Sequence, residues 1–291
     1  MTSKRIGIIG GSGLYEIGGL TQRDRIFLDT PFGAPSDAFV IGEMGGREIV
    51  FLPRHGRGHR ILPTELNYRA NIWGMKKLGV EWLISVSAVG SLREEIEPLD
   101  LVLIDQYVDR TQKRQHTFFG EGIVAHVAFA HPICAELSRV LYEAGQECGQ
   151  GAHIHWGGTY LNMEGPAFST KAESLLYRSW GMDVVGMTNM PEARLAREAE
   201  LCYAAIAMVT DFDCWNEGNP DETVTVEMIL GNLEKNLERV RRILKQAVPN
   251  MPESRTCECG HALENAIVTR PDQIPDGTKK RLELIIRKYL K

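Results

Sequence analysis

Two aspartates, Asp211 and Asp213, are the residues with the clearest chemical potential in this chain. They follow the apolar run Tyr203–Val209, which we predict to be a buried strand that ends at Asp211. Two carboxylates at a strand end are costly unless a ligand uses them, and alternate residues of an extended chain face the same side. The pair predicts a site for a metal ion, or for a base that has both a hydrogen-bond donor and an acceptor. We favour the base, because no histidine or third carboxylate lies nearby in sequence, and one acid can be protonated if burial raises its pKa.

Two glycine-containing segments have groups suited to anions. Gly10-Gly11-Ser12-Gly13 follows the apolar run Ile6–Ile9, and glycine lets backbone N–H groups approach an anion closely. Glu16 stands where a dinucleotide-binding fingerprint needs glycine, and no Lys-Ser/Thr pair follows, so neither that fingerprint nor a P-loop fits. Residues 53–60 (PRHGRGHR) place three arginines and two histidines after another predicted strand, and arginine can clasp phosphate with two parallel hydrogen bonds. A tight turn and a solvated basic loop are the alternative interpretations.

Two more segments follow predicted strands. The segment Ser87-Ala88-Val89-Gly90-Ser91 comes after the run Trp82–Val86. Its small side chains either serve only for close packing or supply further hydrogen-bond donors to the same ligand. In residues 162–169 (NMEGPAFS), Phe168 offers a ring for stacking, and Glu164 or Met163 offers a contact to a sugar. The alternative is a turn that leads into a helix. Ligands of open α/β sheets collect beyond the carboxyl ends of strands, so we expect these segments to converge there.

Cysteines near the C-terminus raise the question of a metal. Cys257-Glu-Cys259-Gly-His261 offers three soft ligands, one fewer than a structural zinc site normally has. We therefore assign no metal and favour a redox pair or an unspecialised tail; whether Cys257 and Cys259 form a disulfide stays open. Six cysteines scattered over 291 residues are not typical of a secreted disulfide framework.

The elements that must position these residues indicate an α/β fold, because short Ile- and Val-rich runs alternate with helical patterns. We expect one domain over residues 1–247, with a central mixed β-sheet flanked by helices. Residues 248–291 are expected to form a C-terminal extension that ends in a helix and packs on the same domain. Thr64 is the expected cap of a helix that runs to Leu78, and Thr170 with Glu173 matches a capping box.

Composition narrows the classes of function. The chain has 33 Lys+Arg and 38 Asp+Glu residues, a formal charge of −5, whereas nucleic-acid binders are usually basic. No apolar run approaches the roughly 18 residues of a membrane span, and the N-terminal apolar stretch is too short and too rich in glycine for a signal segment. We expect a cytoplasmic protein that binds neither nucleic acid nor membranes.

Several motifs, in this order, resemble the 5′-methylthioadenosine phosphorylase family of purine nucleoside phosphorylases. The resemblance covers roughly residues 4–245. The motifs that carry it include GIIGGSGL (7–14), TPFGAPSD (30–37), NYRANIW (67–73), GSLREE (90–95), DQYVDRT (105–111), MEGPAFS (163–169) and TDFDCW (210–215).

The resemblance implies a homotrimer with the purine nucleoside phosphorylase fold and no cofactor. Inorganic phosphate would be the co-substrate that converts 5′-methylthioadenosine to adenine and 5-methylthioribose 1-phosphate. The phosphate ligands carried over from the family are Ser12, Arg54, His55, Ser87, Ala88 and Thr188. The family often has threonine at positions 12 and 87, and serine keeps the hydroxyl.

The resemblance also assigns the nucleoside contacts. Asp211 and Asp213 would read the base, with Ser169 and Phe168 alongside. The remaining contacts are Met187 at the ribose, Val226 and Ile229 at the 5′-methylthio group, and His126 reaching the pocket of a neighbouring subunit. A phosphorylase for methylthioinosine or other 6-oxopurine nucleosides is the alternative, although such enzymes typically lack these acids. A non-catalytic nucleotide-binding module would explain residues 10–13 but not the basic loop and the acid pair.

Overall fold

The structure, a computed structural model, describes residues 5–11, 14, 20–148, 153–216 and 226–290. Its strands are β1 (Arg5–Gly10), β2 (Thr21–Ile26), β3 (Phe39–Met44), β4 (Arg47–Pro53), β5 (Val80–Ser91), β6 (Leu101–Leu103), β7 (Gln106–Asp109), β8 (Ile154–Trp156), β9 (Thr159–Asn162), β10 (Val184–Gly186) and β11 (Cys202–Asp211). Its helices are α1 (Tyr68–Lys77), α2 (Ala135–Cys148), α3 (Lys171–Ser179), α4 (Glu192–Glu198), α5 (Val226–Ala247) and α6 (Asp276–Ile286). No helix in these ranges is long and apolar enough to cross a membrane.

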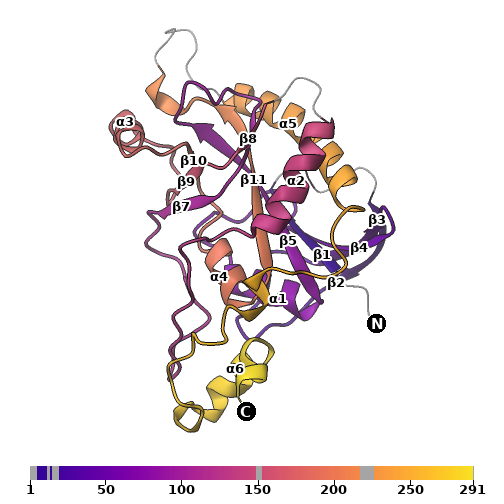
Figure 1. Cartoon of the computed structure of the whole chain (residues 1–291). Coiled ribbons are helices and arrows are strands. Elements are labelled where there is room, and N and C mark those ends of the chain that lie inside the picture. Colours follow the sequence, from indigo (N-terminus) through magenta and orange to yellow (C-terminus); the bar gives the residue numbers. More distant parts are fainter. Residues whose placement is uncertain (1–4, 12–13, 15–19, 149–152, 217–225, 291) are drawn as a thin grey trace.

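The strands in the described ranges form one mixed sheet (Figure 1). At its centre, β1 pairs in parallel with β4 and β5, and β5 pairs in parallel with β11. Antiparallel pairs join β2 to β3, β3 to β4, β10 to β5 and β11 to β6. In register, Gly10 faces Pro53 on one side and Val86 on the other. The segments after residues 10, 53 and 86 therefore begin side by side, and the expected mixed sheet is confirmed.

Both faces of the sheet are buried, which explains the near-continuous apolar runs of its central strands. In β1, Ile8 packs in one hydrophobic cluster and Ile9 in the other. Alternate residues of β5 and β11 divide between the same two clusters. Side chains of α2 and α5 complete one cluster, and side chains of α1, α4 and α6 complete the other. The sheet is thus the middle layer between two groups of helices, as Figure 1 shows.

Two local expectations are corrected by tertiary contacts. Helix α1 is capped by Asn67 rather than Thr64: the side-chain oxygen of Asn67 accepts from the Ala70 N–H, and its amide nitrogen donates to the Phe32 carbonyl at 2.7 Å. Residues 87–91 are not a loop beyond a strand, because β5 continues through Ser91, paired with β11 as far as Gly90 and with β10 at Gly90 and Ser91.

Other local expectations are confirmed. Thr170 and Glu173 form the reciprocal hydrogen bonds of a capping box at the start of α3. Gly45 and Gly46 have φ angles of +54° and +78° at the turn between β3 and β4, a conformation that glycine adopts without steric cost.

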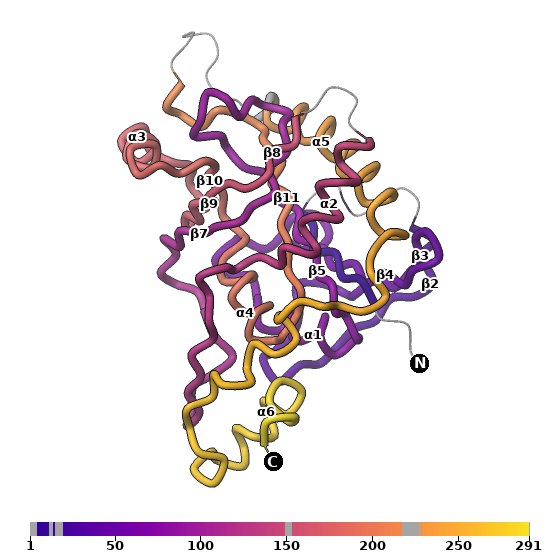
Figure 2. The backbone as a smooth tube through the Cα atoms, viewed as in Figure 1, coloured from indigo at the N-terminus to yellow at the C-terminus, as the bar shows by residue number. Residues whose placement is uncertain are grey.

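Residues 248–290 wrap around the layers described above. Val248 and Met251 are buried with α2 and α5, whereas Leu263 and Leu282 are buried in the cluster on the opposite face. Figure 2 shows the same path: from the end of α5 the tube crosses below the sheet to α6, on the side of α1 and α4. This segment therefore contributes to both hydrophobic clusters.

Candidate active site

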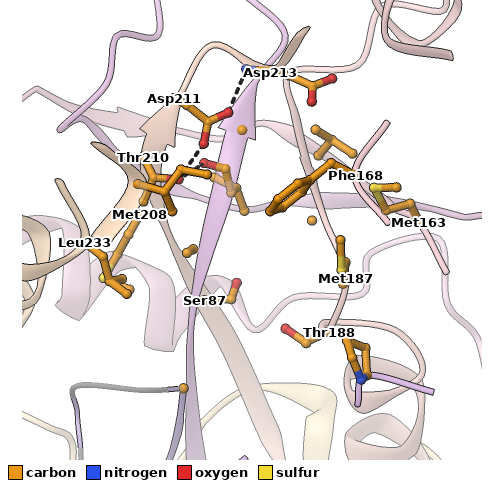
Figure 3. Close-up of a pocket in the computed structure, with 18 of the residues that line it drawn as sticks. Ser87, Met163, Phe168, Met187, Thr188, Met208, Thr210, Asp211, Asp213 and Leu233 are labelled. Carbon is orange, nitrogen blue, oxygen red and sulfur yellow. Dashed lines mark hydrogen bonds between the residues drawn. The ribbon is translucent and has the colours of Figure 1, made fainter. Parts of the chain in front are cut away.

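One large pocket lies at the carboxyl ends of β4 and β11 and along residues 86–90 of β5, and its volume is about 1130 Å³. Arg54 and Asp211, which lie in motifs 157 positions apart (211 − 54), line this same cavity. Figure 3 shows the residues at its two ends, with Ser87 and Thr188 at one and the aspartates at the other. The predicted residues that line it are Arg54, His55, Ser87, Ala88, Phe168, Met187, Thr188, Asp211, Asp213 and Ile229.

Four predicted residues are not among those that line the pocket. Ser12 and the side chain of Val226 lie outside the residues that the structure describes. The Ser169 hydroxyl lies 3.8 Å from Sδ of Met163, which lines the pocket. His126 is exposed and away from the pocket of its own chain; its N–H donates to the Ala266 carbonyl at 2.8 Å. Its predicted role involves a neighbouring subunit and remains a prediction.

Arg54 is buried, with 1% of its surface exposed, and its charge is matched by Glu192. Its Nε lies 3.0 Å from Oε2 of Glu192 and its Nη2 lies 3.2 Å from Oε1. Nη1 donates to the Val86 carbonyl and Nη2 to the Ser85 hydroxyl. Burial acts to lower the pKa of Arg54, and Glu192 more than offsets it, so the guanidinium stays charged.

The two parallel hydrogen bonds that an arginine can make to phosphate are, for Arg54, made to Glu192. A buried guanidinium requires a partner in the folded chain itself, before any ligand arrives. Guanidinium has five N–H groups, and the bonds above, among described residues, leave one Nη1 hydrogen for a ligand. Arg54 can offer that single donor and its positive charge to the pocket.

His55 is neutral and held in one tautomer. Its Nδ1 lies 2.8 Å from the carbonyl oxygen of Ile61, and a carbonyl only accepts, so the proton must be on Nδ1. The Nε2 atom then has a lone pair. Burial lowers the pKa of His55 to about 4, and the charge of Arg54 acts in the same direction. The ring also stacks on His59, with centroids 4.3 Å apart. Nε2 of His55 can therefore accept a hydrogen bond at neutral pH.

Two hydroxyls complete this end of the pocket. The Ser87 hydroxyl donates to the side-chain oxygen of Asn189 at 3.0 Å, and the Asn189 amide donates to Tyr107 at 3.1 Å. The Thr188 N–H lies 3.4 Å from the Tyr160 hydroxyl. Figure 3 shows Ser87 and Thr188 at the same end of the pocket, below Met187. Together with Arg54 and His55 they form a compact polar corner suited to a small oxyanion.

At the opposite end, Asp211 is buried and both of its carboxylate oxygens have hydrogen-bond contacts. Burial raises the pKa of Asp211, and two hydrogen bonds oppose that shift. One oxygen accepts from the Asp213 N–H at 2.8 Å, and the other lies 2.7 Å from the Thr210 hydroxyl. That hydroxyl also lies 3.2 Å from the Val89 carbonyl. A hydroxyl has one proton to donate, so Thr210 shares its proton between the nearer Asp211 carboxylate and the Val89 carbonyl.

Asp213 is placed by a turn and not by strand alternation. It has a φ angle of +49° and begins a short 3-10 helix (Asp213–Trp215), so the prediction that the two acids share one face of an extended strand is wrong. Its carboxylate accepts from the Ser174 hydroxyl at 2.5 Å. Burial raises the pKa of Asp213, and the bonds from Ser174 and Ser169 oppose the shift. A positive φ in a residue other than glycine costs energy and is most common at functional sites.

Apolar side chains line the space between the two polar ends. Phe168, Met163 and Met187 form one wall, and Ile229, Leu230 and Leu233 lie on α5 at the other. Glu164 is not part of this wall: its carboxylate accepts from the N–H of Lys113 at 3.0 Å and from Nε of Arg114 at 3.2 Å. Of the two residues predicted to contact a sugar, Met163 is the one that the structure places in the pocket.

Comparison with known proteins identifies the fold that carries this pocket. Residues 5–249 match the phosphorylase superfamily. This chain belongs to the phosphorylase superfamily. The S-methyl-5′-thioadenosine phosphorylase of Koribacter versatilis is 58% identical over 285 residues, which cover 98% of this chain and 96% of that protein. The resemblance to the methylthioadenosine phosphorylase family is confirmed.

Solved structures agree with the phosphorylase assignment. A methylthioadenosine phosphorylase from an antarctic soil metagenomic library superposes with a TM-score of 0.92 at 45% identity, covering 98% of this chain and 99% of that one. The methylthioadenosine phosphorylase of Schistosoma mansoni in complex with adenine has a TM-score of 0.83 at 38% identity, covering 90% of this chain and 96% of that one.

Several residues that shape the site of this phosphorylase escape sequence reasoning. Glu192 looks like an ordinary acid in the first turn of a helix, and only the tertiary structure places it against Arg54. Arg114, which is buried, donates from Nη1 to the carbonyl of Met187 at 2.6 Å and so fixes the segment that contains Thr188. Unusual burial is the signal for both, and burial of a charged residue is not visible in a single sequence.

Proposed function

We propose that this chain catalyses the phosphorolysis of 5′-methylthioadenosine to adenine and 5-methylthioribose 1-phosphate. The observation that carries the proposal is the shared cavity, with a polar corner for an oxyanion at Arg54 and His55 and two buried acids for a base at Asp211 and Asp213. The names of its relatives support the substrate, and a solved structural neighbour binds adenine.

In the proposed reaction, phosphate attacks the anomeric carbon of the ribose as the bond to N9 breaks. Phosphate is a weak nucleophile, so positioning and charge stabilisation must supply most of the acceleration. Arg54, Ser87 and Thr188 would hold the phosphate, with Ser12 and the backbone at Ala88 alongside. The lone pair on Nε2 of His55 would accept a hydrogen bond from the remaining phosphate hydroxyl, because the Ile61 carbonyl keeps the proton of His55 on Nδ1.

The electron pair of the broken bond moves onto the purine. A protonated Asp211 would donate to N7 of the leaving base, and Asp213 would accept from the 6-amino group. Over a full cycle, the proton lost by hydrogen phosphate balances the proton gained by adenine. A 6-oxo base would leave buried polar groups mismatched, a penalty that reaches about 10⁴–10⁵-fold in sites of this kind. This reasoning favours adenine over hypoxanthine.

The apolar residues of the pocket would bind the rest of the nucleoside. We assign Met187 to the ribose, Phe168 and Ser169 to the surroundings of the base, and Ile229 with Val226 to the 5′-methylthio group. Leu230 and Leu233 extend the apolar surface beside Ile229. We further infer a cytoplasmic homotrimer in which His126 of each subunit closes a neighbouring pocket. The reaction needs inorganic phosphate as co-substrate and no organic cofactor.

The decisive experiment follows adenine release by absorbance with and without phosphate, and then with arsenate. We expect turnover only when an oxyanion is present. Equal cleavage in phosphate-free buffer would make the protein a hydrolase and overturn the proposal.

The variant Asp211→Asn tests the assignment of the acid. An amide cannot be a protonated acid for N7, so we expect kcat/KM for methylthioadenosine to fall by about 10²–10⁴-fold. The kcat/KM for methylthioinosine should fall less, because a 6-oxopurine is better matched by an amide than by an acid at position 211. An unchanged ratio of the two kcat/KM values would show that Asp211 does not read the base.

A further inference from the structure

A second site lies at the far end of β11 from the active-site acids. The Sγ atoms of Cys134, Cys202, Cys257 and Cys259 all lie within 4.8 Å of one another. Cys202 is the first residue of β11 and Asp211 is the last. Nine residues of extended chain separate the two sites by about 30 Å, so the cysteines take no direct part in the proposed reaction.

The spacing of the sulfur atoms fits a metal better than a disulfide. Cys202 Sγ is 3.3 Å from Cys257 Sγ, and Cys134 Sγ is 3.7 Å from Cys257 Sγ. A disulfide requires about 2.05 Å, and all four cysteines are thiols here. Four thiolates at about 2.3 Å from a tetrahedral zinc ion are about 3.8 Å apart. The observed separations need only small adjustments to enclose such an ion.

The backbone holds the four cysteines in place. The Cys134 N–H donates to the Tyr203 carbonyl at 2.8 Å, which fixes Cys134 beside the start of β11. Cys257 and Cys259 flank the start of a short 3-10 helix (Glu258–His261). Cys134, Cys202 and Cys259 are at most 5% exposed. The cluster is therefore closed to solvent on most sides, as structural metal sites are.

A positive charge accompanies the cluster. The guanidinium of Arg255 packs on Gly260, where an added Cβ would lie 2.8 Å from Cζ of the arginine. Arg255 also donates to the Glu200 carbonyl at 2.7 Å, and it interacts electrostatically with Cys202 and Cys257. Four thiolates around a divalent ion carry a net charge of −2, which a neighbouring arginine partly balances.

We propose that these four cysteines bind one zinc ion that fastens the C-terminal segment to the phosphorylase core. Thiolate sulfur is the ligand type that selects zinc over hard cations. Four protein ligands leave no open position, which is the pattern of a structural site and not a catalytic one. Binding exchanges four thiol protons for the ion, with no change in oxidation state.

The proposal replaces the sequence-based interpretation of residues 257–261. His261, the third ligand considered there, points elsewhere: it is exposed and lies 3.9 Å from Glu264. The missing ligands are Cys134 and Cys202, which lie 123 and 55 positions before Cys257. A short motif search cannot join residues that far apart.

The test uses the full chain, purified under reducing conditions without chelator. Its metal content is measured by inductively coupled plasma mass spectrometry. We expect about one zinc ion per chain in the wild type and in Cys148→Ser, a control outside the cluster. Cys257→Ser and Cys259→Ser should lose the ion. Should these variants fail to fold, cobalt(II) added to metal-depleted wild type should give the visible absorption of a tetrahedral thiolate site.

Three results would overturn the proposal. The first is an absence of zinc in wild type after incubation with zinc and reductant, with the cluster thiols still open to alkylation. The second is zinc retained equally by Cys257→Ser. The third is an intact mass that shows the four cysteines paired in disulfides in protein kept under reducing conditions. None of these readouts depends on catalytic activity, so they are independent of the proposed reaction.

Discussion

At the residue scale, the charge and position of Arg54 depend on its buried ion pair with Glu192. Arg54 and Glu192 are each about 1% exposed, and each would be costly without the other. Tyr203 and Ser85 also donate to Glu192, at 2.9 and 2.6 Å. The result is an arginine that keeps its charge and its position before any ligand arrives, which is the preorganisation that catalysis requires.

The variant Glu192→Gln tests this pairing. It leaves Arg54 buried without a counter-charge, so we expect the free energy of unfolding to fall by about 3–5 kcal/mol and the KM for phosphate to rise. Urea unfolding and phosphate titration of the rate measure the two effects. Glu94→Gln is the control, since it breaks an exposed ion pair with Arg178 and should change little. Similar losses in both variants would contradict the argument.

A second residue-scale prediction concerns Gly90, which makes room for the two acids. An added Cβ would lie 3.0 Å from an oxygen of Asp211 and 3.2 Å from Cβ of Asp213. Gly90→Ala should therefore displace the acids and lower kcat/KM by up to about 10²-fold. Gly277→Ala, where nothing lies within 4 Å of the new atom, should retain full activity. Equal activity of the two variants in a steady-state assay would show that the acids tolerate the shift.

At the scale of elements, α4 joins the polar corner at Arg54 to a distant segment. Its first residue is Glu192, and its last residue, Glu198, accepts hydrogen bonds from the Thr117 hydroxyl and the Phe118 N–H, both at 2.7 Å. Burial raises the pKa of Glu198 from 4.5 to about 7, although these bonds oppose the shift. The helix therefore contains a group that titrates near neutral pH.

This raised pKa predicts a pH dependence of stability. The folded state binds the Glu198 proton more tightly than the unfolded state, so its contribution is complete below pH 4.5 and is lost as pH rises through about 7. The variant Glu198→Gln is neutral at every pH. Between pH 5 and 8, the free energy of unfolding of the wild type should therefore fall by up to about 3 kcal/mol more than that of the variant. Urea unfolding at several pH values measures this. Glu143→Gln, on exposed α2 surface, should follow the wild type; a parallel decline in all three proteins would contradict the prediction.

At the scale of the whole molecule, His126 is a predicted substrate contact that the pocket of a single chain does not explain. His126 is exposed and lies outside the pocket that its own chain forms. A role in substrate binding therefore requires a second copy of the chain. The proposed trimer and the proposed role of His126 thus depend on each other.

Mixed oligomers test both proposals together. His126→Ala should raise the KM for methylthioadenosine by up to about tenfold, the effect of one lost hydrogen bond, and sedimentation should show three copies. Co-assembly with Asp211→Asn chains, which keep His126, should restore low KM in part of the sites. Full activity of a monomer, or no change in KM, would remove His126 from the site.

Residues close together in sequence determined what could be predicted without a structure. The capping box at Thr170, the hairpin glycines, the strand that ends at Asp211 and the alternation of strands with helices all depend on spacings of a few residues. These patterns are local because backbone geometry repeats every two or 3.6 residues. The motifs around Arg54 and Asp211 also indicated the phosphorylase family before any coordinates.

Tertiary structure alone decided which of those residues meet and what charge each one carries. Arg54 and Glu192 are 138 positions apart, Asn67 replaces Thr64 as a cap because Phe32 lies beside it, and four distant cysteines converge at the base of β11. Each outcome depends on burial, since a group removed from water must find its partner wherever the fold brings one. Burial is a property of the packed sheet and helices, and no spacing along a single chain encodes it.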